Sequence, residues 1–398
     1  MKNKAFKALW VGEIVSELAG AAGGIINGLI LYELTGSREW MGLLWLVYFL
    51  PSLVLQGGSA PFLNHVAKEK VLKRIQLLRS AAYLFPLIGY VWGMDTLVLG
   101  GLILLQLCLG LLQPIYASLS FSILPDLCRE EELTEANGIL DGTMRLMSFL
   151  APGVTALLLI VVPTQLIYAL SSGLFLFSAL SLSRLPQTEA AEWTKGSWWH
   201  ELKKGYRVFF RYPVLVRTTG LSSLVQFAVG AAMVLSVPFI RGEMGGSQWE
   251  YALFSASFPI GYVLGTWLLK KMPLYSWIMY GGLIGGGLSF SLLWMVPTIP
   301  LAWGCELLGG LLFPLFNARS AAIFQQAAPR ERLAQLSAVR LLMLRITMPL
   351  GILFGSNMFF TLSTRNAFLT IGLIIIVPAS FFLIRSYYGE DKTGRAAA

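Results

Sequence analysis

Residues 96–122 read TLVLGGLILLQLCLGLLQPIYASLSFS and contain no charged side chain. A helix rises about 1.5 Å per residue, so about 20 apolar residues cross the roughly 30 Å hydrocarbon core of a bilayer. Similar stretches recur along the chain, and we predict an all-α polytopic membrane protein with twelve transmembrane helices. The predicted spans are 8–31, 40–63, 71–93, 96–122, 138–162, 164–184, 214–240, 249–270, 274–296, 299–326, 336–361 and 366–387.

The basic residues of the turns between these spans lie almost entirely on one side. The turns after odd-numbered spans hold little beyond Arg38, Arg241 and Arg365. The N-terminus and the turns after even-numbered spans hold Lys2, Lys4, Lys7, Lys68, Lys70, Lys73, Arg74, Arg129, Lys203, Lys204, Arg207, Arg211, Lys270, Lys271, Arg330 and Arg332. Because cytoplasmic loops carry the excess of Lys and Arg, both termini are predicted to be cytoplasmic.

The composition excludes several classes of protein. Only 13% of the residues are charged and 56% are hydrophobic, whereas soluble domains have about 25% charged residues. The net charge of +9 comes from the turns, where anionic lipid explains it, so lipid and not nucleic acid is the expected partner. The three cysteines, Cys108, Cys128 and Cys305, have unrelated spacings and indicate neither a disulfide framework nor a metal site.

An enzyme or a nucleotide-driven pump is not expected either. The two histidines, His65 and His200, lie in separate polar segments, and no nucleophile–base arrangement accompanies them. The chain has no Gly-x-x-x-x-Gly-Lys-Ser/Thr loop for nucleotide phosphates. No cofactor or metal is therefore predicted, and active transport would depend on an ion gradient.

The chain divides into two similar halves. Residues 1–184 and 214–398 each hold six spans, and 185–213 form a cytoplasmic linker with an amphipathic, interfacial helix. GLLQP at 110–114 recurs as GLLFP at 310–314, and PSLVLQG at 51–57 parallels PIGYVLG at 259–265. Apolar helices also resemble one another through composition alone, but the matches keep their order. A six-plus-six repeat is typical of secondary transporters.

Four stretches resemble the major facilitator superfamily, and among its branches the enterobactin-type siderophore exporters and macrolide efflux pumps. They are LWVGEIVS at 9–16 with YELTGS at 32–37, LPDL at 124–127 with EEL at 131–133 and ANG at 136–138, APG at 151–153, and ELKKGY at 201–206. The resemblance implies a twelve-helix fold and a monomer in a bacterial plasma membrane. Pro152 and Gly153 stand at a motif associated with export by antiport, although Ala151 replaces its first glycine.

The resemblance also implies a latch after the second span, where this chain departs from the pattern. Gly57 and Gly58 match the motif, but Asn64 and His65 replace its acidic and basic residues. A later acidic position of the motif is Gln76, whereas the family's arginine is kept as Arg79. Neutral hydrogen bonds are weaker than charge-assisted ones. We therefore expect the latch to hold the outward-facing state less strongly than in relatives.

Glu13 and Glu17 are the first candidates for proton coupling. They lie one helical turn apart and share a face of the first span, with Glu17 roughly 14 Å from its cytoplasmic end. An acidic side chain at the bilayer centre costs about 2.5 kcal/mol or more. Since two carboxylates in a low dielectric do not both ionise easily, at least one is expected to titrate near neutral pH. Alternatively, Glu13 reaches the cytoplasm and Glu17 only hydrogen-bonds a neighbouring helix.

Two further sites carry charge within the spans. Glu306 stands where the repeat has Gln106, which makes it a candidate for asymmetric proton coupling. Asp141 is also a coupling candidate, and with Arg145 it has the i,i+4 spacing of an ion pair. That pair is either structural, or it opens so that Arg145 receives a carboxylate of the substrate.

Polar side chains and prolines complete the predicted site. Gln56, Gln113, Gln226 and Asn317 could line the substrate cavity or simply join helices through hydrogen bonds. The residues predicted to control the conformational change are the loop and helix-bend positions Gly57, Gly58, Asn64, His65, Arg79, Pro152, Gly153 and Pro349.

The predicted function is secondary active export of a small amphiphilic molecule, driven by protons. A macrolide-like drug and a secreted chelator such as a siderophore or metallophore fit equally, and sodium could replace the proton. Uptake transport or flipping of a lysolipid on the same fold is the alternative, although uptake of sugars or peptides usually needs a more polar lining than these spans offer.

Overall fold

The structure is a computed structural model that describes residues 3–35, 38–188, 198–273, 275–356 and 362–394. The regular elements of this part are all helical, which confirms the predicted all-α class. Four short helical segments join or extend the α-helices: η1 (Ala60–His65), η2 (Glu130–Glu132), η3 (Pro238–Glu243) and η4 (Arg330–Arg332). Of these, η3 is a π-helix that continues directly from the helix before it.

The α-helices follow one another with short connections, apart from the segment before α8. In the first half they are α1 (Lys4–Thr35), α2 (Arg38–Gly58), α3 (Lys68–Ala82), α4 (Leu84–Trp92), α5 (Asp95–Leu127), α6 (Leu133–Val161) and α7 (Thr164–Leu182). The linker carries α8 (Trp198–Arg211). The second half holds α9 (Pro213–Val237), α10 (Gln248–Leu269), α11 (Ser276–Leu292), α12 (Ile299–Ala327), α13 (Leu333–Gly355) and α14 (Thr364–Gly394).

Eight helices of the described chain are long and apolar enough to cross a membrane. They are α1, α5, α7, α9 with η3, α10, α12, α13 with η4, and α14. The remaining four predicted spans correspond to α2, the pair α3 and α4, α6, and the shorter α11. Each predicted span therefore coincides with a helix or a broken pair of helices over its described residues, and the end of the eleventh span, 357–361, lies outside them.

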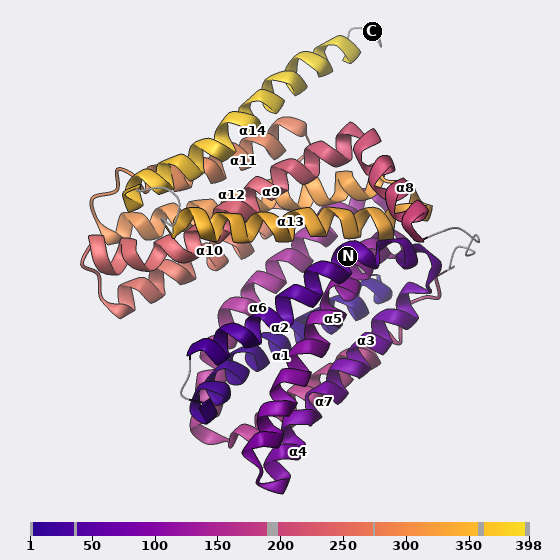
Figure 1. Cartoon of the computed structure of the whole chain (residues 1–398). Helices are drawn as coiled ribbons and strands as arrows, with labels where there is room; N and C mark the ends of the chain where they lie inside the picture. The colour runs from indigo at the N-terminus through magenta and orange to yellow at the C-terminus, as the bar shows by residue number, and fades with distance from the viewer. Residues whose placement is uncertain (1–2, 36–37, 189–197, 274, 357–361, 395–398) are drawn as a thin grey trace. The chain divides into compact units, whose positions relative to one another are not determined.

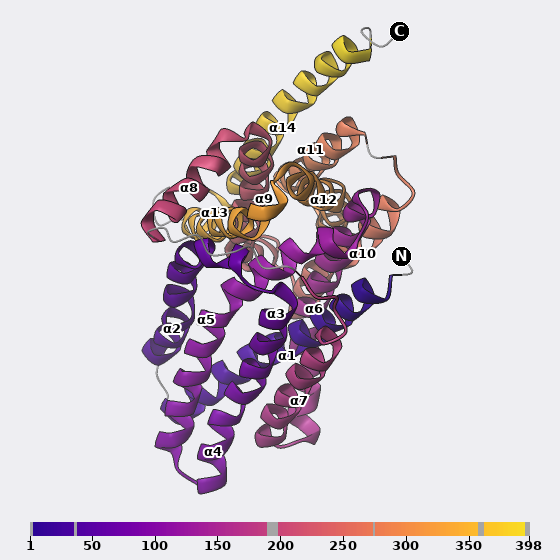
Figure 2. The same cartoon turned by 90° about the vertical axis from the view of Figure 1, so that its right-hand side faces the viewer.

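The third predicted span is broken at Tyr83, where α3 ends and α4 begins. Pro86 in the first turn of α4 has no N–H to donate to the carbonyl one turn earlier, so the helix bends there. Figure 2 shows α4 continuing onward from α3 after this break. Gly89 of α4 and Gly101 of α5 let the two backbones come close, because a Cβ at either position would overlap the neighbouring main chain.

The helices pack into two compact units. Unit 1 comprises Met1–Glu130, Met147–Arg211 and Ala328–Leu342, and unit 2 comprises Glu131–Leu146, Tyr212–Ala327 and Met343–Ala398. The first parts of α6 and α13 thus pack with helices of the opposite half of the sequence. The predicted division at residues 184 and 214 follows the internal repeat. It remains a prediction, because the two units reflect which helices pack side by side and not where the repeat begins and ends.

Unit 1 is built on pairs of neighbouring helices (Figure 1). In it α1 packs on α7, α2 on α5, and α3 on both α5 and α7. Aromatic side chains fill the space between α3, α4 and α7, with Tyr83, Tyr168 and Phe175 almost fully buried. This packing holds α1 and α3 side by side with α5 and α7, and so positions the charged residues described below.

Unit 2 is centred on α12, against which α10, α11 and α9 pack, while α14 lies on α11. Its core contains the buried rings of Phe239, Phe254, Tyr262, Phe313 and Phe368. The α10–α12 contact is especially close, because a Cβ at Gly261 or Gly310 would meet the main chain of the opposite helix. Small residues permit this approach, which is how helices associate in lipid.

The α10–α12 contact gives a direct test of the packing. Gly310→Ala places a methyl group against the Phe258 carbonyl and should destabilise the protein by about 1–3 kcal/mol. Gly304→Ala on the same helix is the control, because a Cβ there meets open space. Thermal unfolding in detergent should separate the two variants, and equal melting temperatures would show that this contact is wrongly placed.

Candidate functional site

Unit 1 contains a buried cluster of charged side chains, Glu13, Glu17 and Arg79, which we call the carboxylate cluster. Glu13 and Glu17 come from α1 and Arg79 from α3. Glu13 is 5% exposed and Arg79 only 3%. The charges of Glu13 and Arg79 both act on Glu17, which places the three groups within one electrostatic site.

Arg79 is held by neutral partners and aromatic rings. Its guanidinium donates to Gln76 Oε1 at 3.2 Å, to Ser16 Oγ at 3.4 Å and to Gln113 Oε1. It also lies over the Tyr116 ring, 4.6 Å from the ring centroid. Within the described residues Arg79 forms no ion pair closer than 4 Å, so its charge is balanced over a longer distance by Glu13 and Glu17.

A residue of α5 holds the Glu13 side chain in place. Ser120 donates a hydrogen bond to Glu13 Oε1, and the buried hydroxyl of Tyr116 lies close to the same carboxylate. Glu17 is only half-buried and accepts no side-chain hydrogen bond from the described part of the chain. Glu17 is therefore the carboxylate that can most readily change its partner or its protonation.

Unit 2 contains a second cluster, which we call the arginine–tyrosine cluster: Asp141, Arg145, Phe258, Tyr262 and Asn317. Arg145 Nε lies 3.3 Å from Asp141 Oδ1, which confirms the ion pair expected from their spacing. The Tyr262 hydroxyl donates to Asp141 Oδ2 and accepts from Asn317 Nδ2 at 2.9 Å. Helices α6, α10 and α12 thus meet through a continuous polar chain.

The guanidinium of Arg145 also rests on two aromatic rings. Its Cζ lies 4.3 Å from the Tyr262 ring centroid and 5.8 Å from that of Phe258. Cation–π contacts of this kind stabilise a charge in a place that water reaches poorly. The ion pair is nevertheless accessible, because 23% of the Arg145 side chain and 34% of the Asp141 side chain remain exposed.

The predicted cavity-lining amides have different surroundings. Gln113 belongs to the surroundings of Arg79, and Asn317 belongs to the arginine–tyrosine cluster. Gln56 is fully buried and donates to Ser118 Oγ at 2.9 Å and to the Ala338 carbonyl at 3.3 Å, which are the bonds of a residue that joins helices. Gln226 is half-buried on α9.

The other predicted positions lie apart from both clusters. Glu306 is half-buried on α12 and has no hydrogen-bonding partner in the described part of the chain. Pro349 is exposed on α13. Pro152 and Gly153 lie within α6, but their side-chain surroundings are outside what the structure describes.

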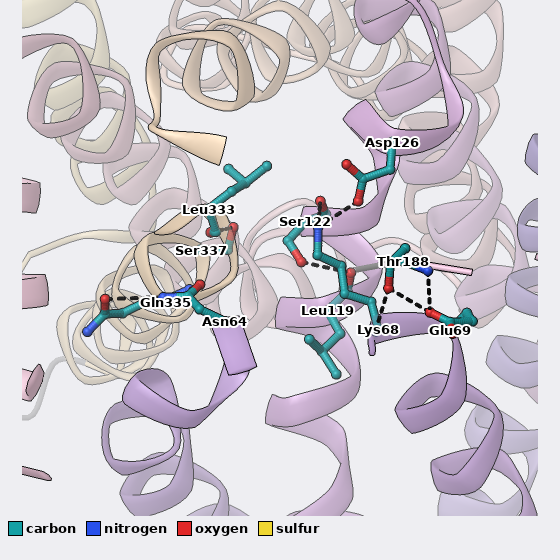
Figure 3. A network of polar contacts seen from close by, with 10 residues as sticks. All are labelled: Asn64, Lys68, Glu69, Leu119, Ser122, Asp126, Thr188, Leu333, Gln335 and Ser337. Carbon is teal, nitrogen blue, oxygen red and sulfur yellow. Dashed lines mark hydrogen bonds and ion pairs between the residues drawn. The ribbon is translucent and has the colours of Figure 1, made fainter. Parts of the chain in front are cut away.

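Asn64, at the position where the latch is predicted, makes a neutral contact, and its role as a latch stays a prediction. Asn64 Oδ1 accepts from the Gln335 main-chain N–H at 3.0 Å, and Asn64 Nδ2 donates to Gln335 Oε1 at 3.4 Å (Figure 3). Gln335 Nε2 in turn donates to the Glu201 carbonyl of α8 at 2.8 Å. Since Gln335 stands in the first turn of α13, Asn64 binds a helix N-terminus whose N–H groups lack partners within the helix.

Charged contacts lie beside this neutral latch (Figure 3). Lys68 Nζ pairs with Asp126 Oδ2 at 2.6 Å and donates to the Ser122 carbonyl at 3.1 Å. Glu69 Oε2 accepts from the Thr188 main-chain N–H at 3.0 Å and from its hydroxyl at 2.6 Å. These contacts fasten the start of α3 to the end of α5 and to the first residues of the linker.

Several residues of these sites were not predicted from the sequence. Tyr116 and Gln335 lack any local pattern that marks them, because their partners lie far away in the chain. Tyr262 follows Phe258 by one helical turn, and that aromatic pair on one face of α10 was the available signal.

The comparisons with known proteins agree with the membrane fold. A family model described as Major Facilitator Superfamily matches residues 9–351. A curated relative, the uncharacterized MFS-type transporter YvqJ of Bacillus subtilis (strain 168), is 22% identical over 342 residues, which cover 82% of this chain and 79% of the relative.

Solved structures resemble the whole chain at low sequence identity. A bacterial homologue of the iron transporter ferroportin, in its outward-facing state, has a TM-score of 0.75 at 16% identity and covers 96% of this chain and 99% of its own. The human organic anion transporter MFSD10 has a TM-score of 0.71 at 12% identity, covering 96% and 98%. The E. coli fucose:proton symporter FucP has 0.70 at 13%, covering 94% and 98%. At these identities the likeness concerns the fold alone.

The latch yields a prediction about the start of α13. Asn64→Asp should bind the N-terminus of α13 more strongly, by about 0.3–1 kcal/mol, because a negative charge is favoured at that end of a helix. A cysteine placed at buried Ser337, in a chain whose native cysteines are replaced, should then react with a maleimide roughly 2- to 5-fold more slowly.

The matched control is Asn366→Asp, which changes the same side chain at the start of α14 and should leave the labelling rate at position 337 unaltered. Equal labelling rates in Asn64→Asp and in the parent chain would contradict the role given to Asn64.

Proposed function

The chain belongs to the Major Facilitator Superfamily, and on that premise we propose that it is a proton-driven exporter of a small amphiphilic organic molecule. Proteins of this family are membrane transporters and not, in general, enzymes. The cargo classes that fit are a secreted chelator, such as a siderophore or metallophore, and a macrolide-like drug. The proposed location is the cell membrane, with both termini in the cytoplasm and a monomer as the working unit.

The observation that carries this proposal is the buried carboxylate cluster. The cluster brings two carboxylates and one guanidinium together. Solvent hardly reaches the side chains of Glu13 and Arg79. Ionised side chains within a membrane are costly and are typical of ion pathways and proton relays. Packing alone does not require them, because α1 and α7 elsewhere contact each other through apolar residues and serine hydroxyls such as Ser178 and Ser181.

The charge balance of the cluster suits proton exchange. With both carboxylates ionised, the three side chains carry a net charge of −1, and a single bound proton makes them neutral. Glu17 is the more exposed carboxylate and lacks the Ser120 hydrogen bond that fixes Glu13. We therefore assign Glu17 as the proton carrier and Glu13 as its charged neighbour, with Arg79 compensating the negative charge.

We propose export rather than uptake because of the kinds of side chain that the spans carry. In the described part of the chain the amides of Gln113 and Asn317 are engaged within the clusters, which suits an amphiphilic cargo better than a highly hydroxylated solute such as a sugar. A lysolipid remains the alternative cargo. The solved structures of similar fold include an iron transporter homologue, an organic anion transporter and a fucose:proton symporter, so the fold itself favours no cargo or direction.

Everted membrane vesicles test the coupling. With an acidic lumen, wild-type protein should accumulate enterobactin or erythromycin inside the vesicles, and a protonophore should abolish this. Glu17→Gln should lose nearly all of the gradient-driven accumulation, because an amide cannot take up the driving proton.

Glu33→Gln is the control on the same helix, since Glu33 is exposed near the end of α1, and it should transport normally. Accumulation that persists in Glu17→Gln, or that is insensitive to the protonophore for both cargoes, would contradict proton-driven export through this cluster.

A further inference from the structure

The internal repeat supplies a natural comparison for the arginine–tyrosine cluster. α6 and α13 each begin directly after a short η segment, at Leu133 and Leu333, and aligning these starts pairs Asp141 with Leu341 and Arg145 with Arg345. Aligning Pro259 with Pro51 pairs Tyr262 with Val54 and Phe258 with Leu50, and aligning Pro314 with Pro114 pairs Asn317 with Ala117. Asp141, Tyr262 and Asn317 therefore have apolar counterparts in the other half, whereas Arg145 corresponds to another arginine.

The first turns of α13 make the equivalent helix contact in unit 1. Ala338 of α13 accepts a hydrogen bond from Gln56 of α2 through its carbonyl. Leu342 lies against Gly57, where a Cβ would be 3.3 Å from its methyl carbon. In unit 2 the matching contact brings α6 against α10. A Cβ added at Gly142 would lie 2.9 Å from the Thr266 hydroxyl. This helix pair is thus packed in unit 1 without a carboxylate at the position of Asp141.

Asp141 in unit 2 consequently needs a reason other than packing. Arg145 and Asp141 lie about 12–18 Å along α6 from its first residue, where ionised groups are costly. Both remain partly exposed, so a solute that reaches the cluster can contact them. An ion pair kept at this depth but left accessible is suited to exchange one of its members for a ligand.

The geometry around Arg145 shows which member can be exchanged. Two rings support the guanidinium from one side, at 4.3 and 5.8 Å from their centroids, so it stays in place when its anion changes. Asp141 approaches only Nε, at 3.3 Å, and this contact lacks hydrogen-bond geometry. Arginine has five N–H donors arranged as a fork that fits a carboxylate, and Asp141 does not use this fork fully.

Asp141 has a second partner that holds it when it leaves Arg145. The Tyr262 hydroxyl donates to Asp141 Oδ2, and Asn317 supports Tyr262 through its own hydrogen bond at 2.9 Å. A displaced Asp141 therefore keeps one hydrogen bond, and an incoming carboxylate finds a supported cation next to the face of two rings.

We propose that Arg145 is the anion-binding group of the cargo site and that the cargo is an aromatic or amphiphilic organic carboxylate, which displaces Asp141 from the guanidinium. This proposal names the cargo class of the proposed function. Its meaning for transport therefore rests on that function. It favours an acidic chelator over a macrolide, because the amine of a macrolide would carry a positive charge toward Arg145.

Binding to the purified protein in detergent tests this without any transport step. Radiolabelled salicylate and salicylamide are the probes, since they share the ring and differ in the carboxylate. In equilibrium dialysis, wild-type protein should bind salicylate roughly 10-fold or more tightly than salicylamide, because hydrogen bonds between charged groups are the stronger ones. Asp141→Asn keeps an acceptor for Tyr262 but removes the competing charge, so it should bind salicylate more tightly than wild type.

Arg145→Leu removes the guanidinium and should abolish the preference for salicylate. Because this change leaves Asp141 without its counter-ion, the neutral double variant Asp141→Asn with Arg145→Leu is measured as well, and it should fold and show no preference. Arg217→Leu is the control, as Arg217 also lies over a ring, that of Phe382 at 5.8 Å, and it should keep the wild-type preference.

Opposite effects of the Asp141 and Arg145 variants distinguish anion binding from a structural ion pair, whose loss would weaken binding in both. The proposal is overturned if wild type binds salicylate no better than salicylamide, or if the double variant retains the preference. If the protein prefers salicylate but its vesicles move no protons, the proposed function is contradicted and the assignment of Arg145 as an anion-binding group is retained.

Discussion

The cost of placing a charged side chain in hydrocarbon governs where this protein keeps its ionisable residues. In the two clusters of the described chain, the buried charges are compensated by an opposite charge, by aromatic rings or by amides and hydroxyls. Arg79 has all three kinds of support, through Glu13 and Glu17, the Tyr116 ring, and Gln76 with Gln113. Because such arrangements are costly to maintain, they identify the places where charge is used.

The two halves share their helix order but differ in chemistry. Gln106 of α5 accepts from Asn27 at 3.2 Å, and Asn27 accepts from Tyr168 at 2.9 Å, forming a buried neutral network in unit 1. Its counterpart in unit 2 is Glu306, which the described structure leaves without a hydrogen-bonding partner. The carboxylate cluster lies in one unit and the arginine–tyrosine cluster in the other. A repeat that encodes packing twice therefore encodes each polar site only once.

Much of the fold could be predicted from the sequence, because hydrophobic length and period are local properties. Over its described residues, each predicted span coincides with a helix or a broken pair of helices. The i,i+4 spacing of Asp141 and Arg145 correctly indicated their ion pair. The break at Tyr83 and the π-helix at η3 were not predicted, although Pro86 was a local signal for the break. Likewise, no local pattern links Glu13 to Ser120 or Asn64 to Gln335, because each pair joins elements distant in the chain.

The central claim, that cargo leaves as protons enter, is tested most directly by the proton movement that cargo alone drives. Proteoliposomes containing the pH dye pyranine are loaded with cargo and diluted into cargo-free buffer of the same pH, with potassium and valinomycin holding the membrane potential at zero. The account predicts that the lumen acidifies as cargo leaves, at a rate that follows cargo efflux. A lumen that keeps its pH while cargo leaves, or that becomes alkaline, would contradict antiport.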